Sequence, residues 1–310
     1  MRRIAPFVVF GIGLLVLLAG IIKVLPGGIG LGAAWMFWGL LMFGLSFIPR
    51  PVVEPTDGPE LSAIQRVFGM FYMPGAVFAS FRRHPSWLLP LIIVTLISGA
   101  YSIAFNKVVT PERIADQMTT KTLQSFVDRG WMTADMVKDR HEIALKQLQS
   151  KTQQIEGVFS GMVTSYLRMA IAGAVMMLLV LIFGGRINYW QAFSVSAYAS
   201  LPIVIINKVI SFPLLYVKDP TDIHPILNQD TLIQDNLGVL LDPANNPVLF
   251  VLAATIGVLS IYRLWLSATG LRNAGEKVSS TAAWATTLTI FAVLLGFVVL
   301  VVTFFPGSIG

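Results

Sequence analysis

The sequence contains no cysteine, only three histidines and few charged residues. Without cysteine, neither a disulfide framework nor a thiolate metal site can form. Charged residues make up 12% of the 310 residues, whereas a soluble domain holds about a quarter. Hydrophobic residues make up 55%. This balance excludes a large water-soluble domain and indicates a protein embedded in a lipid bilayer.

Long hydrophobic runs account for this excess. Seven runs are long enough to cross a hydrocarbon core, which takes roughly 20 helical residues, and none contains Asp or Glu. Because lipid offers no hydrogen bonds to the backbone, each run is expected to be a helix. The expected fold class is an all-α polytopic membrane helical bundle with about seven transmembrane helices. The runs cover residues 4–22, 29–48, 86–105, 166–185, 190–209, 247–269 and 283–305.

The runs divide the chain into three parts. Residues 1–48 form an N-terminal transmembrane hairpin, and residues 49–85 form a cytoplasmic linker with an amphipathic interfacial helix. Residues 86–305 form a five-helix membrane domain. Within it, the polar segment 106–158 is expected to be a helical insert on the outer side of the membrane.

The first run also fits a cleaved signal peptide, because Arg2 and Arg3 precede an apolar stretch. The run is longer than the apolar part of most signal peptides, and a second run follows at once. We therefore expect a retained helix. Cleavage would leave the orientation of the rest unchanged.

The distribution of positive charge predicts the orientation. With a cytoplasmic N-terminus, most basic residues of the short connecting segments lie in the cytoplasm, as the positive-inside rule requires. The insert opposes this trend, because it places eight basic residues, with seven acidic ones, on the outer side. We expect a cytoplasmic N-terminus, an outer C-terminus and a bacterial inner or plasma membrane. The cytoplasmic set is Arg2, Arg3, Arg50, Arg66, Arg82, Arg83, Arg186, Arg272 and Lys277.

A segment with one apolar face lies between the second and third runs. Apolar residues recur at helical spacing from Leu61 to Phe71, and Pro74 interrupts the pattern. Such a helix either lies in the membrane interface or packs on the rim of the bundle, and the pattern leaves both open. The net charge of +6 is scattered between apolar runs, so we expect anionic lipid headgroups as partner and no nucleic acid. The candidate headgroup contacts are Arg66, Arg82 and Arg83.

Two basic residues within the later runs suggest an alternative. Lys208 either snorkels to the outer surface or is buried in a substrate path. Arg263 is expected to snorkel to the cytoplasmic side. A path near Lys208 and Arg263 would make the protein a small-solute transporter or channel. The absence of carboxylates from the runs argues against common proton or sodium coupling.

Small residues predict close contacts between helices. The stretch from Gly28 to Gly32, GIGLG, superficially matches a nucleotide-binding loop, but no strand precedes it, so we expect helix packing. Gly157 and Gly161 predict a second contact surface on the fourth span.

The sequence holds no recognisable catalytic or metal-binding constellation. His141-Glu142 begins a zinc-protease pattern, but Leu145 stands where the second histidine is needed. The aspartates of 218–246 do not have the spacing of a calcium loop. We expect no catalytic residue, no cofactor and no metal.

Three passages together resemble the Yip domain family, named for interaction with Ypt/Rab GTPases, and its bacterial members in particular. FASFRRHPSWLLP at 78–90 is similar to the aromatic start of that domain. AYASLP at 197–202 is similar to a loose Tyr-to-Pro signature in a central helix, and YRLWLSATGL at 262–271 to a helix end. The matching residues, with structural roles, are Pro85, Trp87, Pro90, Tyr198, Ser200, Pro202, Trp265 and Gly270.

We expect a non-enzymatic bundle that organises membrane or recruits proteins, with protein partners or a homo-oligomer in addition to lipid. The resemblance itself implies an integral membrane protein of unassigned activity. It also implies the orientation argued above. The hairpin 1–48 and the insert 106–158 are not part of the usual domain. The acidic-aromatic cytosolic motif of eukaryotic members is not evident, so a GTPase partner rests on family analogy alone.

Overall fold

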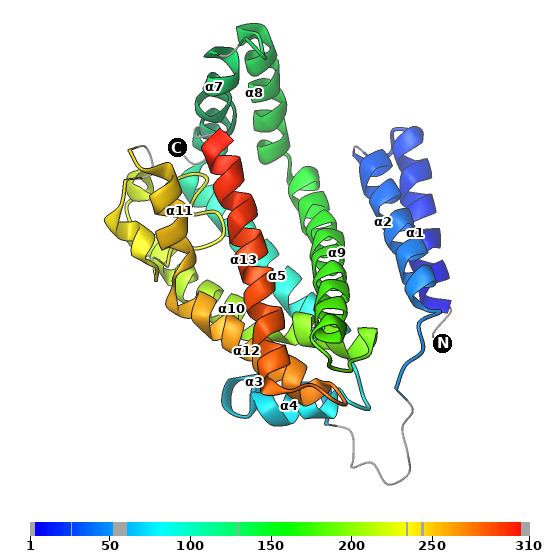
Figure 1. Ribbon diagram of the computed structural model, residues 1–310. Helices are drawn as coiled ribbons and strands as arrows, with labels where there is room; N and C mark the ends of the chain where they lie inside the picture. The colour runs from blue at the N-terminus through cyan, green and yellow to red at the C-terminus, as the bar shows by residue number, and fades with distance from the viewer. Residues whose placement is uncertain are drawn as a thin grey trace.

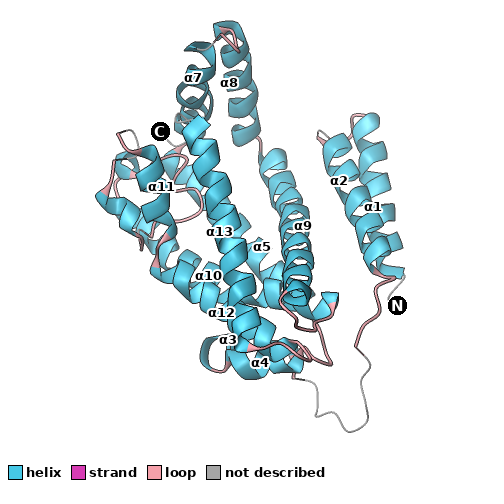
Figure 2. Cartoon of the chain, viewed as in Figure 1, coloured by secondary structure: helices cyan, strands magenta, loops and turns pink. Residues whose placement is uncertain are grey.

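The chain forms a bundle of long helices. The structure, a computed structural model, describes residues 4–25, 27–51, 61–128, 130–233, 235–242 and 245–304. Within these ranges it contains helices and two isolated bridges, but no strand (Figures 1 and 2). The all-α fold class is confirmed. Arg2, Arg3 and most of the linker at 52–60 lie outside the described residues.

Helices α1 (Ile4–Ile21) and α2 (Gly28–Leu45) form the N-terminal hairpin. Glycines allow the two backbones to touch, as the sequence predicted for Gly28 and Gly32. A Cβ at Gly28 would lie 2.8 Å from the Val16 carbonyl oxygen, and one at Gly32 would overlap the backbone of Leu17. Gly30, between them, faces open space.

Six helices are long and apolar enough to cross a membrane. Besides the hairpin they are α5 (Leu88–Val109), α9 (Lys151–Ile182, apolar from Gln154), α10 (Tyr189–Val217) and α13 (Ser280–Phe304). α9 begins well before residue 166, where its membrane span was predicted to start. Glu156 therefore lies on the same continuous helix as the fourth span, ten residues before the predicted start of the apolar run.

The predicted single helix over 247–269 was also wrong. The structure has α11 (Pro247–Thr255) and α12 (Val258–Ala274), separated at Ile256 and Gly257. The break is stabilised by Asp235, whose carboxylate accepts a hydrogen bond from the Leu259 amide at 2.7 Å. An acidic residue at a helix N-terminus satisfies amides that the helix leaves unpaired.

The insert is a helical hairpin, as predicted. It consists of α6 (Pro111–Asp116), the π-helical turn η1 (Gln117–Lys121), α7 (Thr122–Asp128) and α8 (Ala134–Gln149). Gly130, with φ of 72°, turns the chain between α7 and α8. Thr133 caps α8 through the Met136 amide. Thr110 precedes α6 but makes no side-chain cap bond to it.

The two ends of the bundle differ. Helices α7 and α8 project from one end, here named the insert end (Figure 1). Helices α3 (Ala63–Tyr72) and α4 (Pro74–Ser80) lie across the opposite end, here named the α3 end (Figure 1). The short 3-10 helices η2 (Pro220–Asp222) and η3 (Leu237–Leu240) belong to the loops between α10 and α11. The bridge between Arg186 and Lys277 ties the α9–α10 and α12–α13 loops together.

The core lies where α9 and α10 cross. Gly173 of α9 allows this crossing, because a Cβ there would lie 2.7 Å from the Phe193 Cα. The contact surface predicted at Gly157 and Gly161 was wrong, since neither has an atom within 4 Å of an added Cβ. The close approach is therefore about three to four turns further towards the α3 end.

Replacing Gly173 by alanine tests this crossing. The added methyl group must displace backbone, so we expect Gly173→Ala to lower the free energy of unfolding by about 1–3 kcal/mol. Gly161→Ala, on the same helix with open space, is the control and is expected to gain up to about 1 kcal/mol from helix propensity. Thermal unfolding of both variants in detergent measures the difference. Equal melting temperatures would contradict the packing.

Candidate functional site

The first half of α10 is the most deeply buried part of the bundle. From Gln191 to Ala199, every residue except Ser196 is buried. Its hydroxyls bond within the helix, Ser194 to the Trp190 carbonyl at 2.8 Å and Ser200 to the Ala197 carbonyl at 2.8 Å. These bonds let small polar residues lie among apolar neighbours without loss of hydrogen bonds.

The N-terminus of α10 connects two other segments. The Asn188 amide group donates to the Pro49 carbonyl at 3.0 Å, and the Trp190 indole nitrogen donates to the Ile48 carbonyl at 3.0 Å. Gln191 accepts from the Asn188 backbone amide at 2.7 Å and donates to the Arg82 carbonyl at 2.9 Å. One helix start thus holds the end of the hairpin and the end of α4.

The residues of the family resemblance surround this segment. Trp87 stacks on Phe193 with ring centroids 5.2 Å apart, and Tyr198 contacts Phe81 at 4.8 Å. A Cβ at Gly270 would lie 2.6 Å from a Val195 methyl group, so glycine lets α12 approach α10.

The remaining motif residues vary in burial. Pro90 is buried in α5, whereas Pro85 is half-buried just before that helix. Pro202 is buried inside α10, and Trp265 stacks on Tyr262 while 42% exposed. Apart from Trp265, which is largely exposed, these residues lie in or against the core.

The three candidate headgroup arginines do not share one surface. Arg66 is only 3% exposed and lies over the Phe81 ring, with its guanidinium beside the Tyr198 hydroxyl. Arg82 is exposed, and its Nε donates to the Asn273 carbonyl at 2.6 Å. Arg83 is half-buried. Burial leaves Arg66 no surface for a headgroup, because α3 turns Arg66, Gly69 and Met70 into the bundle and its aromatic residues outward.

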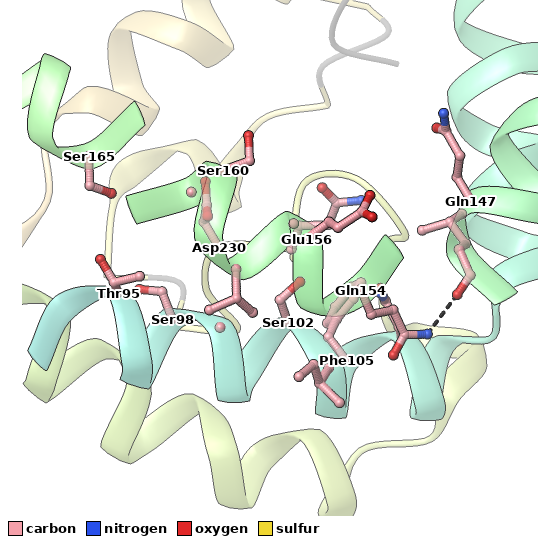
Figure 3. Close-up of a pocket in the computed structure, with 18 of the residues that line it drawn as sticks. Thr95, Ser98, Ser102, Phe105, Gln147, Gln154, Glu156, Ser160, Ser165 and Asp230 are labelled. Atoms are coloured by element: carbon pink, nitrogen blue, oxygen red, sulfur yellow. Dashed lines mark hydrogen bonds between the residues drawn. The ribbon is translucent and has the colours of Figure 1, made fainter. Parts of the chain in front are cut away.

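A cavity of about 780 Å³ lies in the insert half of the bundle. It is bounded by α5 and α9, by α8 of the insert, and by the turn between α1 and α2. Figure 3 shows side chains of α5 and α9 on facing sides of it. Its α5 wall carries Thr95, Ser98, Ser102 and Asn106. Its α9 wall carries Gln154, Glu156, Gly157, Ser160, Gly161 and Ser165.

Lys208 reaches this cavity from α10. It is 6% exposed, its ammonium donates to the Asp230 carbonyl at 2.5 Å, and it lies 4.0 Å from the centre of the Tyr101 ring. Of the two alternatives left open by the sequence, burial rather than surface exposure holds. Arg263 is not among the cavity residues; it is exposed on α12, where Arg168 acts on it electrostatically. Lys208 and Arg263 therefore do not line one path.

Sequence reasoning missed the cavity, although a signal was present. On α5, polar residues recur at 95, 98, 102 and 106, and on α9 polar or small residues recur at 154, 157, 161 and 165. Both series follow the period of a helix and mark one face. Two such faces in neighbouring spans predict a polar space between them.

Acidic residues outside the spans serve as local caps. Hydrogen bonds from Thr221 hold the pKa of Asp219 below its usual value. Backbone and Gln149 hydrogen bonds lower the pKa of Glu112. His141 bonds Thr119 at 3.0 Å within the insert. In the described part of the chain, no group of three or more His, Cys, Asp or Glu could hold a metal ion.

Gln191 offers a test of the junction at the start of α10. Gln191→Met keeps the shape but leaves the Asn188 amide and the Arg82 carbonyl without their buried partner. Each group left unpaired costs about 1–3 kcal/mol, so we expect a clear loss of thermal stability in detergent. Ser200→Ala, which removes a bond within one helix, is the control with a smaller loss. A Gln191→Met protein as stable as the control would contradict this role.

Comparison with known protein families identifies the region that contains the motif residues. The Yip1 domain matches residues 68–303, which run from within α3 to the end of α13 and include the insert. No curated protein and no solved structure matches the chain significantly. The matched region covers most of the chain and all three motif passages, and the chain therefore belongs to the Yip1 domain family, as a multi-pass membrane protein.

Proposed function

We propose that this protein is a non-enzymatic membrane organiser that inserts α3 into one leaflet of the bilayer. The observation that carries the proposal is the apolar face of α3, which no other part of the described chain covers. Ile64, Phe68 and Tyr72 are 68%, 63% and 69% exposed, and Phe71 is 41% exposed. An amphipathic helix of this kind buries such a face at the boundary between headgroups and acyl chains.

The position of α3 supports this role. A capping box between Ser62 and Gln65 fixes its start, and Met73 and Pro74 separate it from α4. α4 is anchored, because Val77 and Phe78 are fully buried and α4 packs on α12. The anchor holds α3 at the ends of the spans, which is the depth of the membrane interface.

Basic residues supply the electrostatic part of the proposal. Arg82 is exposed and Arg83 half-buried directly after α4. At the depth of the interface, their guanidinium groups would contact anionic headgroups. We assign the α3 end to the cytoplasm on the positive-inside argument. Protein partners or a second copy of the chain would assemble on the insert or on this end. A GTPase partner is not part of the proposal.

Vesicle size tests the organising role. Wedging α3 into one leaflet expands that leaflet, so reconstituted protein should yield smaller vesicles than protein-free lipid. Phe68→Ser with Phe71→Ser should abolish the effect, measured by electron cryomicroscopy of vesicles at matched protein density. Met136→Ser with Ile143→Ser on α8, also exposed and apolar, is the matched control and should retain it. Equal effects of the two double variants would contradict the proposal.

Thiol labelling tests the orientation, because the native chain has no cysteine. We expect an impermeant thiol reagent to label Ile143→Cys on α8 in intact spheroplasts. Arg83→Cys should react only after the membrane is permeabilised. Labelling of Arg83→Cys first would reverse the assignment.

A second candidate function is the binding or transport of a small polar solute. The cavity favours it, because its walls carry polar groups and it reaches Lys208. Aromatic packing of Trp87, Tyr166 and Phe193 lies beside the cavity on the side of the α3 end, with ring centroids 5.1–5.5 Å apart. A solute would thus enter from the insert end, and passage would require these rings to move.

A further inference from the structure

We propose that the cavity between α5 and α9 selects small, positively charged polar solutes, and that the Glu156 carboxylate is the selecting group. The inference rests on the second candidate function, entry of a polar solute into this cavity. It adds the chemical class of the solute and the residue that recognises it.

The charges around the cavity leave one carboxylate without compensation. Among the described residues of its lining, the charged ones are Lys208, Asp230 and Glu156. The Lys208 ammonium is held by the Asp230 carbonyl and the Tyr101 ring, and the Asp230 carboxylate interacts with it electrostatically. These two charges offset each other. Glu156 has no ion-pair partner among the described residues, so the lining carries a net negative charge.

Glu156 also lacks a hydrogen-bond partner. Its Oε1 is buried and receives no hydrogen bond from any described group. The other side of the carboxylate lies against Gly27, where a Cβ would be 2.8 Å from the carboxyl carbon. Gly27 precedes the first turn of α2, whose N-terminus favours a negative charge. The hairpin thus packs against the carboxylate, and its Oε1 is left without a hydrogen-bond partner that a solute could supply.

The opposite wall supplies a second unpaired group. Thr95 is only 7% exposed, and its hydroxyl oxygen has no partner. Figure 3 shows Thr95 beside Ser98 on α5, facing the side of the cavity that carries Ser160 and Ser165. A buried hydroxyl without a partner costs free energy that a bound polar group recovers. The lining therefore suits a cationic solute that also carries hydroxyl or amide groups.

The absence of native cysteine permits a direct test on the full chain in lipid nanodiscs. Ser102→Cys places one thiol on the α5 wall, and Ser98→Cys is a second version if the first folds poorly. The reaction rate of the introduced thiol is measured with cationic trimethylammonium-ethyl methanethiosulfonate and with anionic sulfonatoethyl methanethiosulfonate. Each rate is divided by the rate of a cysteine peptide in solution.

We expect the cationic reagent to be favoured by roughly tenfold, because a unit charge within a few ångströms in partly hydrated surroundings raises counter-ion concentration by about that factor. Glu156→Gln should reduce the preference to that of the peptide. Glu142→Gln is the control, because this α8 carboxylate is exposed and paired with Lys146 at 3.7 Å.

The outcomes separate the two proposals. If neither reagent reacts, no solute enters and the second candidate function fails together with this inference. If both react without a preference for the cation, or if the preference survives Glu156→Gln, entry stands and the selecting role of Glu156 is overturned. A preference lost in Glu156→Gln and kept in Glu142→Gln supports the proposal.

Discussion

The structure depends on how α10 begins. In a bilayer, an unpaired backbone group costs several kcal/mol, so a helix start enclosed by two other segments requires a partner for every polar group. Asn188, Trp190 and Gln191 provide these partners and bond to Ile48, Pro49 and Arg82 in doing so. The hydrogen bonds that satisfy the helix start are the same ones that attach the hairpin and α4. Packing of α9 and α12 on α10 through Gly173 and Gly270 follows from this fixed point.

From this point the bundle divides into two unlike halves. Towards the α3 end, aromatic rings and small residues fill the space between α9 and α10, and Arg66 is enclosed beside Tyr198. Towards the insert end, α5 and α9 separate around a polar cavity. Both halves use small residues in α9, but Gly173 faces another helix, whereas Gly157 and Gly161 face open space. A glycine pattern is thus compatible with close helix contact or with a gap. Which of the two forms depends on whether another helix packs against the glycines.

The sequence predicted what depends on local pattern. Membrane spans, the insert and Pro74 between two short helices follow from periodicity and helix breakers, and the structural role of Tyr198 follows from the family resemblance. It failed where a distant contact decides. Asp235, far along the chain, caps α12 and divides a run that is apolar throughout. α9 continues as one helix beyond its apolar part, which brings Glu156 onto the same helix as the fourth span. Arg66 was a candidate headgroup contact, yet α3 buries it together with Gly69 and Met70 against the bundle.

Hydrogen–deuterium exchange of the full chain in nanodiscs tests the central claim. The claim is that hydrogen bonds anchor the start of α10 and that a polar cavity lies between α5 and α9 in the insert half of the bundle. We predict the slowest exchange in residues 191–202. In α9, amides of 154–165 beside the cavity should exchange faster than those of 170–182 in the core, although both lie within one membrane span. Uniform protection along α9, or exchange in 191–202 as fast as in α13, would contradict the account.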